Sequence, residues 1–171
     1  MSEVSDKSRE VPWLSAPEQK AWRGYRRMRT LLDLQLARDL ARDSALSEPD
    51  YDVLSTLSER SEPWRMSELA ERLLWSPSRL THQVGRMEGR GLVRREPCLD
   101  DARGSLLTLT DTGVQVLEAA APMHVRSVRH HFIDLLSQDE VDCLAHVTAK
   151  VLAHLGVRAS AAPTRDAPGK G

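Results

Sequence analysis

The sequence predicts a mainly α-helical protein with a small β-hairpin. Leu is the dominant apolar residue, and the 171 residues include a single Phe and a single Ile, a balance that favours helices over a large sheet. Helix-start signals recur along the chain, and one pair of short apolar segments has the spacing of a hairpin. The length fits one domain.

Two helices are expected in the first third of the chain. Ser15-Ala16-Pro17-Glu18 has the pattern of a capping box, so a long helix should run from there to about Asp43. Ser47-Glu48-Pro49-Asp50 repeats the start signal and opens a second helix that should end near Ser61.

The middle of the chain predicts a helix-turn-helix followed by a hairpin. Ser67 should start a short helix over 68–74, and Ser76-Pro77 should start another that ends at Gly91. A strand over 92–96, a loop over 97–104 and a return strand over 105–109 should follow. This order of elements is that of a winged helix-turn-helix lobe.

Two further helices close the expected fold. Thr110-Asp111 should cap a helix over 111–135, and the pair Ser137 and Glu140 should open a last helix to Leu155. That last helix has a wide apolar stripe, which predicts burial against a partner. The expected organisation is a disordered arm (1–14), N-terminal helices (15–62), the winged lobe (63–110), dimerisation helices (111–155) and a disordered tail (156–171).

The helix over 77–90 divides into two faces. Leu80, Val84 and Met87 share one face and should lie in the core. The opposite face has short polar and basic side chains with two glycines, which suits close approach to the DNA major groove. Between Ser76 and Arg95 there are five Arg and one Glu, a net charge of +4 in a chain whose net charge is −1. A merely solvated polar face is the alternative, and the surrounding pattern favours DNA binding.

The segment Ser67–Gly113 resembles the DNA-binding lobe of the multiple antibiotic resistance regulator (MarR) family. The likeness rests on Ser-Glu-Leu-Ala at 67–70, Ser-Arg-Leu-Thr at 78–81 and Gly-Leu-Val at 91–93. Its most specific part is Asp-x-Arg-Gly at 101–104, followed by Leu-Thr-Asp-x-Gly at 109–113. The resemblance implies a homodimer that binds a palindromic operator on double-stranded DNA and releases it when a small ligand binds.

The resemblance also implies which residues contact DNA. The wing arginine Arg103 would enter the minor groove and Asp101 would hold its loop, whereas Gly85 departs from the larger polar residue common at that point. An arginine at a hairpin tip independently suits a narrow minor groove, although a surface Asp–Arg pair is the plainer alternative. The expected contacts of the recognition helix are Ser76, Ser78, Arg79, Thr81, His82 and Arg86.

An effector site is less well defined by the sequence. Trp22, Tyr25, Arg26 and Arg29 lie on the first helix and would suit an anionic aromatic ligand, although core or dimer contacts are the plainer interpretation. No metal site or cofactor is expected. His124, His131 and Asp134 can share a helix face, yet solvated or interface histidines are the simpler interpretation. Sensing of pH by the same histidines is a further alternative.

The remaining features weigh against other classes of protein. Cys98, at the base of the wing, is a candidate oxidant sensor or an inert surface thiol, and Cys143 is expected in the core. No nucleophile motif or phosphate-binding glycine loop is present in the sequence, so an enzyme is not expected. With no candidate membrane span or signal peptide, a cytoplasmic regulator that represses a nearby gene is expected. An architectural or protein-interaction module without a ligand is the alternative.

Overall fold

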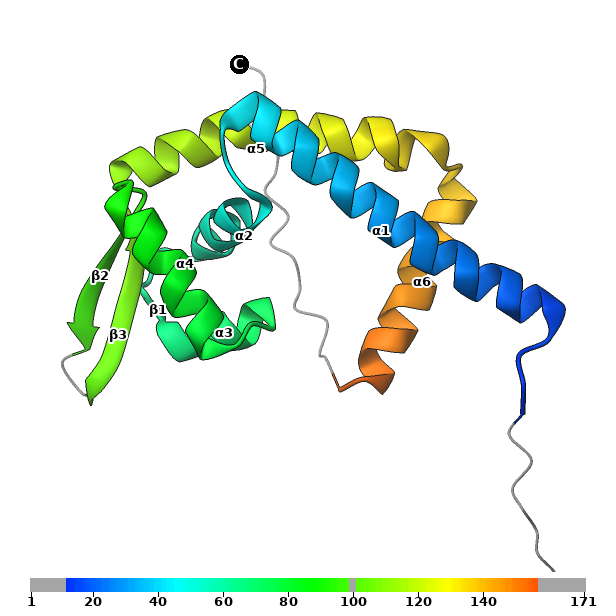
Figure 1. The fold of residues 1–171 in the computed structure, drawn as a ribbon, viewed down its shortest axis with the longest axis horizontal. Coiled ribbons are helices and arrows are strands. Elements are labelled where there is room, and N and C mark those ends of the chain that lie inside the picture. Colours follow the sequence, from blue (N-terminus) through cyan, green and yellow to red (C-terminus); the bar gives the residue numbers. More distant parts are fainter. Residues whose placement is uncertain (1–11, 99–100, 157–171) are drawn as a thin grey trace, which may run out of the picture. The chain divides into compact units, whose positions relative to one another are not determined.

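A computed structural model describes residues 12–98 and 101–156, without the side chains of 101–103. The described residues form six α-helices, one 3-10 helix and a three-stranded sheet (Figure 1). The chain divides into two compact units between residues 35 and 36, within the first helix. Most of the expected arm (1–14) and most of the expected tail (156–171) lie outside the described residues.

The first helix, α1 (Ala16–Ser44), begins at the expected capping box. The Ser15 backbone N–H and the Ser15 hydroxyl each donate to Glu18 at 2.7 Å. Only its last turns, which belong to the second unit, contain buried side chains, at Asp39 and Leu40. The helix therefore has the predicted start and ends one residue beyond the predicted end.

The second helix, α2 (Glu48–Leu57), shows the predicted start but not the predicted end. Ser47 caps the helix, since its hydroxyl oxygen accepts from the Asp50 backbone N–H. The Asp50 carboxylate in turn accepts from the Ser47 backbone N–H and the Ser47 hydroxyl, which completes the capping box. The helix ends at Leu57, four residues before Ser61, because Ser58 closes it by bonding back to Leu54. Local cap chemistry fixes the start, while the end follows from where the chain must turn into the sheet.

The helix-turn-helix consists of α3 (Met66–Leu73) and α4 (Pro77–Gly89). Helix α3 starts at Met66, two residues before the predicted start at 68, so Ser67 lies inside the helix and does not cap it. No side chain caps α3. Ser76 caps α4 by accepting from the Arg79 backbone N–H, as predicted. Gly91 follows the helix at φ +69°, a left-handed conformation that favours glycine and confirms the predicted stop.

The wing is longer in strand and shorter in loop than predicted. Strands β2 (Val93–Cys98) and β3 (Asp101–Leu109) pair antiparallel, so residues expected in a loop over 97–104 belong mainly to the strands. Trp64 and Arg65 form a two-residue edge strand, β1, that pairs with Leu107 and Leu106. The sheet order β1-β3-β2 therefore ties the segment before α3 to the wing.

The C-terminal part contains α5 (Asp111–His131), the 3-10 helix η1 (Ile133–Leu135) and α6 (Gln138–His154). Thr110 caps α5 through the Gly113 backbone N–H at 3.0 Å. A Cβ at Gly113 would lie 2.0 Å from the Leu92 carbonyl oxygen, so only glycine allows this close approach. The predicted helix over 111–135 is wrong at its end, since Phe132 breaks the helical backbone and η1 follows.

The core lies within the winged lobe and the helices that pack on it. Leu80, Val84 and Met87 are fully buried, which confirms the predicted inner face of α4. Leu54, Leu69 and Leu107 join them from α2, α3 and β3. The two cysteines are placed the other way round from the prediction: Cys98 is buried and Cys143 is exposed.

Candidate nucleic-acid interface

The outer face of α4 is open to solvent along its length. Leu80 and Val84 are fully buried in the core on the inner face of the helix. Because the core is closely packed, the side chains on the opposite face point to solvent. All six recognition-helix residues singled out in the sequence are exposed: Ser76, Ser78, Arg79, Thr81, His82 and Arg86. Gly85 and Gly89 lie on the same exposed side and leave it without bulky side chains.

Two arginines on this face are held in defined positions. The Arg79 guanidinium lies 4.0 Å from the centre of the Trp75 ring, a cation–π contact in the turn between α3 and α4. Arg86 donates to the Gln83 side-chain oxygen, and Gln83 in turn donates to Asp50 at 2.7 Å. Arg79 and Arg86 make no salt bridge with the described residues, so their charges are available to a ligand.

The other three arginines of the +4 segment are paired with acidic groups. Arg90 bonds the buried Asp50 carboxylate at 2.8 Å. Arg94 pairs with Glu96 at 2.8 Å and Arg95 with Glu88 at 3.1 Å. The count along the sequence therefore overstated the local positive charge, because Asp50 and Glu96 lie outside the segment that was counted.

The carboxylate of Asp50 remains ionised in this setting. Burial raises the pKa of Asp50, but hydrogen bonds from Ser47 and the Arg90 guanidinium outweigh burial, so its pKa is lowered overall. A charged Asp50 is a strong acceptor for both Gln83 and Arg90. The exposed polar face of α4 is thus tied to the first turn of α2.

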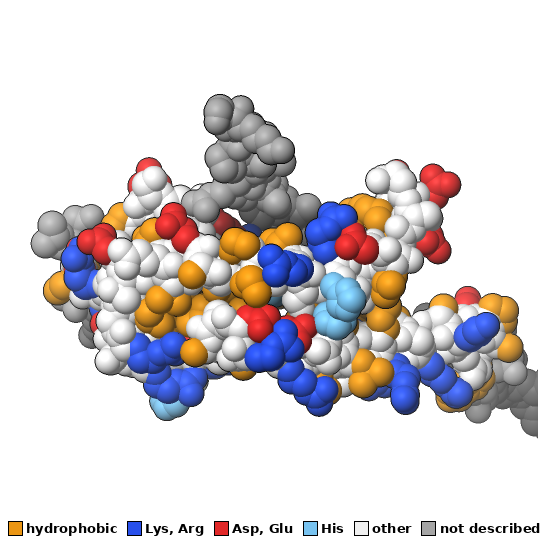
Figure 2. Space-filling view, turned by 90° about the horizontal axis from the view of Figure 1, so that it is seen from above, with side chains coloured by type: hydrophobic (Ala, Val, Ile, Leu, Met, Phe, Trp, Pro, Cys, Tyr) orange, Lys and Arg blue, Asp and Glu red, His pale blue; other side chains and the backbone are white. Residues whose placement is uncertain are grey.

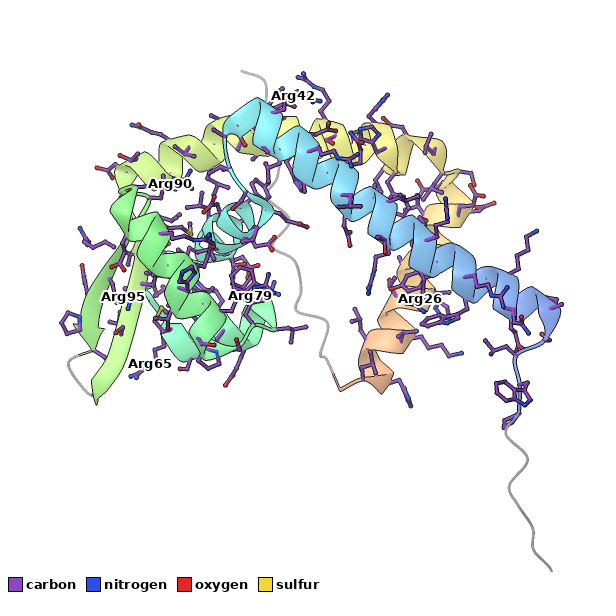
Figure 3. All side chains as sticks on the ribbon, viewed as in Figure 1. Arg26, Arg42, Arg65, Arg79, Arg90 and Arg95 are labelled. Carbon is purple, nitrogen blue, oxygen red and sulfur yellow. The ribbon has the colours of Figure 1, made fainter. Side chains whose placement is uncertain are left out.

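A second polar feature lies at the base of the wing, and sequence reasoning missed it. A cavity of about 300 Å³ is lined by Arg65, Met66, Ser67, Thr81, Arg95, Gly104 and Ser105. Figure 3 labels Arg65 and Arg95 in this part of the lobe, on β1 and β2. The Nε of Arg95 is buried without a hydrogen-bond partner. The pairing of Trp64–Arg65 with residues more than forty positions later creates this cavity, and no local pattern announces such a pairing.

Comparisons with known proteins agree with this geometry. The family model described as the MarR family matches residues 46–105. AbsC, a MarR family transcriptional regulator from Streptomyces coelicolor, is 41% identical and superposes with a TM-score of 0.80 over 85% of this chain and 99% of that chain. The chain belongs to the MarR family.

Two further relatives of this MarR-family chain bear on its role. Sco3205, a MarR family transcriptional regulator from Streptomyces coelicolor whose structure was solved in complex with DNA, is 38% identical with a TM-score of 0.82, over 91% of this chain and 98% of that chain. The HTH-type transcriptional repressor MdtR of Bacillus subtilis (strain 168) is 31% identical over 100 residues, 58% of this chain and 63% of MdtR. The resemblance found in the sequence is thereby confirmed, and these relatives are named as transcriptional regulators.

The wing residues of this MarR-family chain are only partly described. Asp101 and Arg103 belong to β3 rather than to the predicted loop, and Asp101 pairs with Cys98 across the hairpin. The positions of the Asp101 and Arg103 side chains lie outside the described part of the structure. Their roles in contacting DNA stay predictions.

The predicted effector residues form a contiguous group on α1. Trp22 and Tyr25 are about half exposed and their rings stack with centroids 6.0 Å apart. The Arg26 guanidinium lies 6.0 Å from the centre of the Trp22 ring, and Arg29 is exposed. The group has the predicted aromatic and cationic character, and its role as a ligand site stays a prediction.

The histidines of the C-terminal part have other contacts. His131 bonds the Asp39 carboxylate at 2.9 Å, and His124 packs on the Tyr51 ring with centroids 4.4 Å apart. Burial lowers the pKa of His124, so the neutral ring is favoured there. Among the described residues, no group of three or more His, Cys, Asp or Glu side chains is arranged to hold a metal ion.

Proposed function

We propose that this protein is a homodimeric transcriptional repressor that binds a palindromic operator and is released from it by a small ligand. The observation that carries the proposal is the division of α4 into a buried apolar face and an exposed polar face. The exposed face offers Arg79 and Arg86 as unpaired cations among short hydroxyl side chains and glycines. The DNA complex of the relative Sco3205 supports a DNA ligand for the same fold.

Direct base reading is assigned to the exposed face of α4. Arg86 has five N–H donors and gives one of them to Gln83, so the others are free for the edge of a guanine. Ser78, Thr81 and His82 are short enough to allow the helix to enter a major groove. Arg103 in the wing is assigned to the minor groove, as the sequence predicts.

Phosphate binding is assigned to the cavity at the base of the wing. Two arginines, Arg65 and Arg95, line it together with the hydroxyl-bearing residues Ser67, Thr81 and Ser105. Arg95 is already paired with Glu88, so Arg65, which makes no salt bridge with the described residues, is the cation that best suits a phosphate oxygen. Such contacts fix the register of the lobe on DNA without reading its sequence.

A homodimer is supported by the apolar side chains that this chain leaves exposed. No residue of α6 is buried. Four apolar side chains on and just after this helix are between 39% and 67% exposed: Val147, Val151, Leu152 and Leu155. Figure 2 shows hydrophobic side chains on the surface of the single chain. A helix of this composition is stable in water when a second copy covers it, and two copies of the lobe would match a palindrome.

Ligand release rests on the aromatic group of α1. Trp22, Tyr25 and Arg26 offer stacking surface and positive charge, which suits an anionic aromatic effector. A repressing direction is supported by the printed name of the relative MdtR.

A mobility-shift experiment on the DNA beside the protein's own gene tests the proposal. The wild-type protein should shift this DNA in the presence of excess unrelated DNA, and its affinity should fall steeply as salt rises. The variant Arg79→Ala/Arg86→Ala should lose the preference for this DNA. Equal affinity for every DNA would favour an architectural module, and no binding at all would refute a role on DNA.

A further inference from the structure

A chain of polar side chains crosses from the first turn of α2 to the exposed face of α4. Asp50 is 4% exposed and Gln83 is 3% exposed, and they are joined by a 2.7 Å hydrogen bond. Gln83 then accepts from the exposed Arg86. A buried route therefore leads from a capping residue of α2 to the arginine assigned to base reading.

The donors and acceptors of this chain allow one arrangement. An ionised carboxylate only accepts hydrogen bonds and a guanidinium only donates them. The Asp50 carboxylate must therefore accept a hydrogen bond from the amide nitrogen of Gln83. The amide oxygen of Gln83 is then left to accept from Arg86. The two ends of the chain thus fix the orientation of the glutamine between them.

The carboxylate of Asp50 is itself held in place. Ser47 donates to it through its backbone N–H at 3.0 Å and its hydroxyl at 2.7 Å. Arg90 donates to it at 2.8 Å from the end of α4. Gln83 and Arg90 are two helical turns apart, so the first turn of α2 holds α4 at two points along its length.

We propose that Asp50 and Gln83 are positioning residues that orient Arg86 for reading DNA. A long arginine side chain on an exposed face loses rotamer entropy when it is fixed on a base, which weakens binding. Gln83 fixes part of that side chain before DNA arrives, so sequence preference depends on residue 50, on another helix. The inference rests on the proposed function, since it concerns the same DNA-binding face.

The first test compares Gln83→Met and Asp50→Asn with the wild-type chain. Met keeps the bulk of Gln83 without its polar atoms, and Asn at position 50 removes the charge that fixes the amide. DNA enriched from a random library by the wild-type protein serves as the specific site. Each variant should lose about three- to tenfold in affinity for this DNA relative to unrelated DNA, with an unchanged salt slope.

Thr56→Val is the matched control for a general loss of stability. Thr56 is a buried polar residue of α2 and has no bond to Asp50, Gln83 or Arg86 in the described structure. This variant should change the melting temperature without changing the preference for the specific DNA. If Gln83→Met leaves that preference unchanged, as Thr56→Val does, the positioning role is refuted.

A double-mutant cycle separates positioning from a direct contact by Gln83. In the Arg86→Ala background, Gln83→Met should cause no further loss of sequence preference. Losses that simply add would overturn the proposal. Failure of the proposed function is distinguished at the outset, because the wild-type protein would then enrich no DNA from the library.

A measurement without DNA completes the test. In the free protein, the Arg86 side-chain Nε–H signal in an NMR spectrum should be resolved from those of mobile arginines. It should move to the position of a mobile arginine in Gln83→Met and in Asp50→Asn but not in Thr56→Val. An Arg86 signal already typical of a mobile side chain in the wild-type protein would contradict the proposal.

Discussion

Arg90 and Arg86 differ by one turn of α4 and have different partners. Arg90 reaches inward to the buried Asp50 carboxylate, whereas Arg86 is on the exposed face and contacts the polar end of Gln83. Removing Arg90 leaves a buried carboxylate without its cation, which is costly, whereas removing Arg86 exposes no unpaired charge.

We expect Arg90→Ala to lower the free energy of unfolding by about 1–3 kcal/mol and to reduce sequence preference on DNA less than Arg86→Ala does, because Ser47 still holds the Asp50 carboxylate. Arg86→Ala should show the reverse, with a loss of about 1–3 kcal/mol in specific binding and near-normal stability. Urea unfolding and DNA titrations on the same preparations measure both effects. Equal losses of stability in the two variants would contradict these roles.

Asp52 is a half-buried carboxyl on α2 with a pKa raised to about 6. Burial is the main cause of the raised pKa, the Glu48 carboxylate adds to it, and the Arg79 guanidinium opposes it. Since the pKa in the folded chain exceeds the ordinary value of 3.8, the folded state binds the proton more tightly than the unfolded state. Asp52 therefore reduces stability progressively as the pH rises from about 4 to about 6, and the reduction is complete above that range.

Asp52→Asn should stabilise the protein at pH 7.5 by at most about 3 kcal/mol and have little effect near pH 4. The measurement is the difference in free energy of unfolding between the variant and the wild-type protein at several pH values. A difference that does not change with pH would show that Asp52 titrates normally.

At the scale of elements, the helix starts with a side-chain cap were predictable, whereas the uncapped start of α3 and several other features were not. A cap such as Ser47 with Asp50 is a contact within four residues, so the sequence pattern contains all of its parts. The face of α4 was predictable for the same reason, since periodicity is local. Strand β1 and the Asp50–Gln83 bond join residues more than thirty positions apart, which no local pattern reveals. Cys143 was misplaced because cysteine as a residue type favours burial, whereas α6 buries no side chain in this chain.

The wing should contribute affinity mainly through Arg103. Arg103→Ala should weaken binding to the specific DNA by about tenfold or more, equivalent to about 1.4 kcal/mol. Asp101→Ala should act in the same direction but less, although removing a negative charge near DNA would by itself tighten binding. Fluorescence titrations with labelled DNA measure both. A tighter Asp101→Ala complex and an unaffected Arg103→Ala complex would show that the wing does not bind as proposed.

Helix α6 should carry part of the dimer interface. Val147 and Val151 are one turn apart and about half exposed, so Val147→Glu/Val151→Glu places two charges on the proposed interface. This variant should be monomeric or strongly dissociated by light scattering while its helical content is retained. Ala149→Glu, on the other side of the same helix, is the control and should remain dimeric. A dimeric double variant would exclude this face of α6 from the interface.

At the scale of the whole molecule, the winged lobe positions the proposed DNA-reading residues and its own core supports them. The buried carboxylate of Asp39 adds a second anchor, since Ser127 and His131 of α5 bond it at 2.6 Å and 2.9 Å. The hydrogen bond from Ser127 is the main reason that the pKa of Asp39 falls to about 2. The end of α1 is thereby fixed to α5. None of the helices described is long and apolar enough to cross a membrane.

In the proposed complex, two copies of this lobe read the two halves of a palindrome. The most direct measurement is a hydroxyl-radical footprint on the DNA selected by the wild-type protein, combined with the mass of the complex. We expect two protected half-sites related by a dyad, with centres one helical turn or a multiple of it apart, and two chains per site. A single protected half-site, or one chain per site, would contradict the claim.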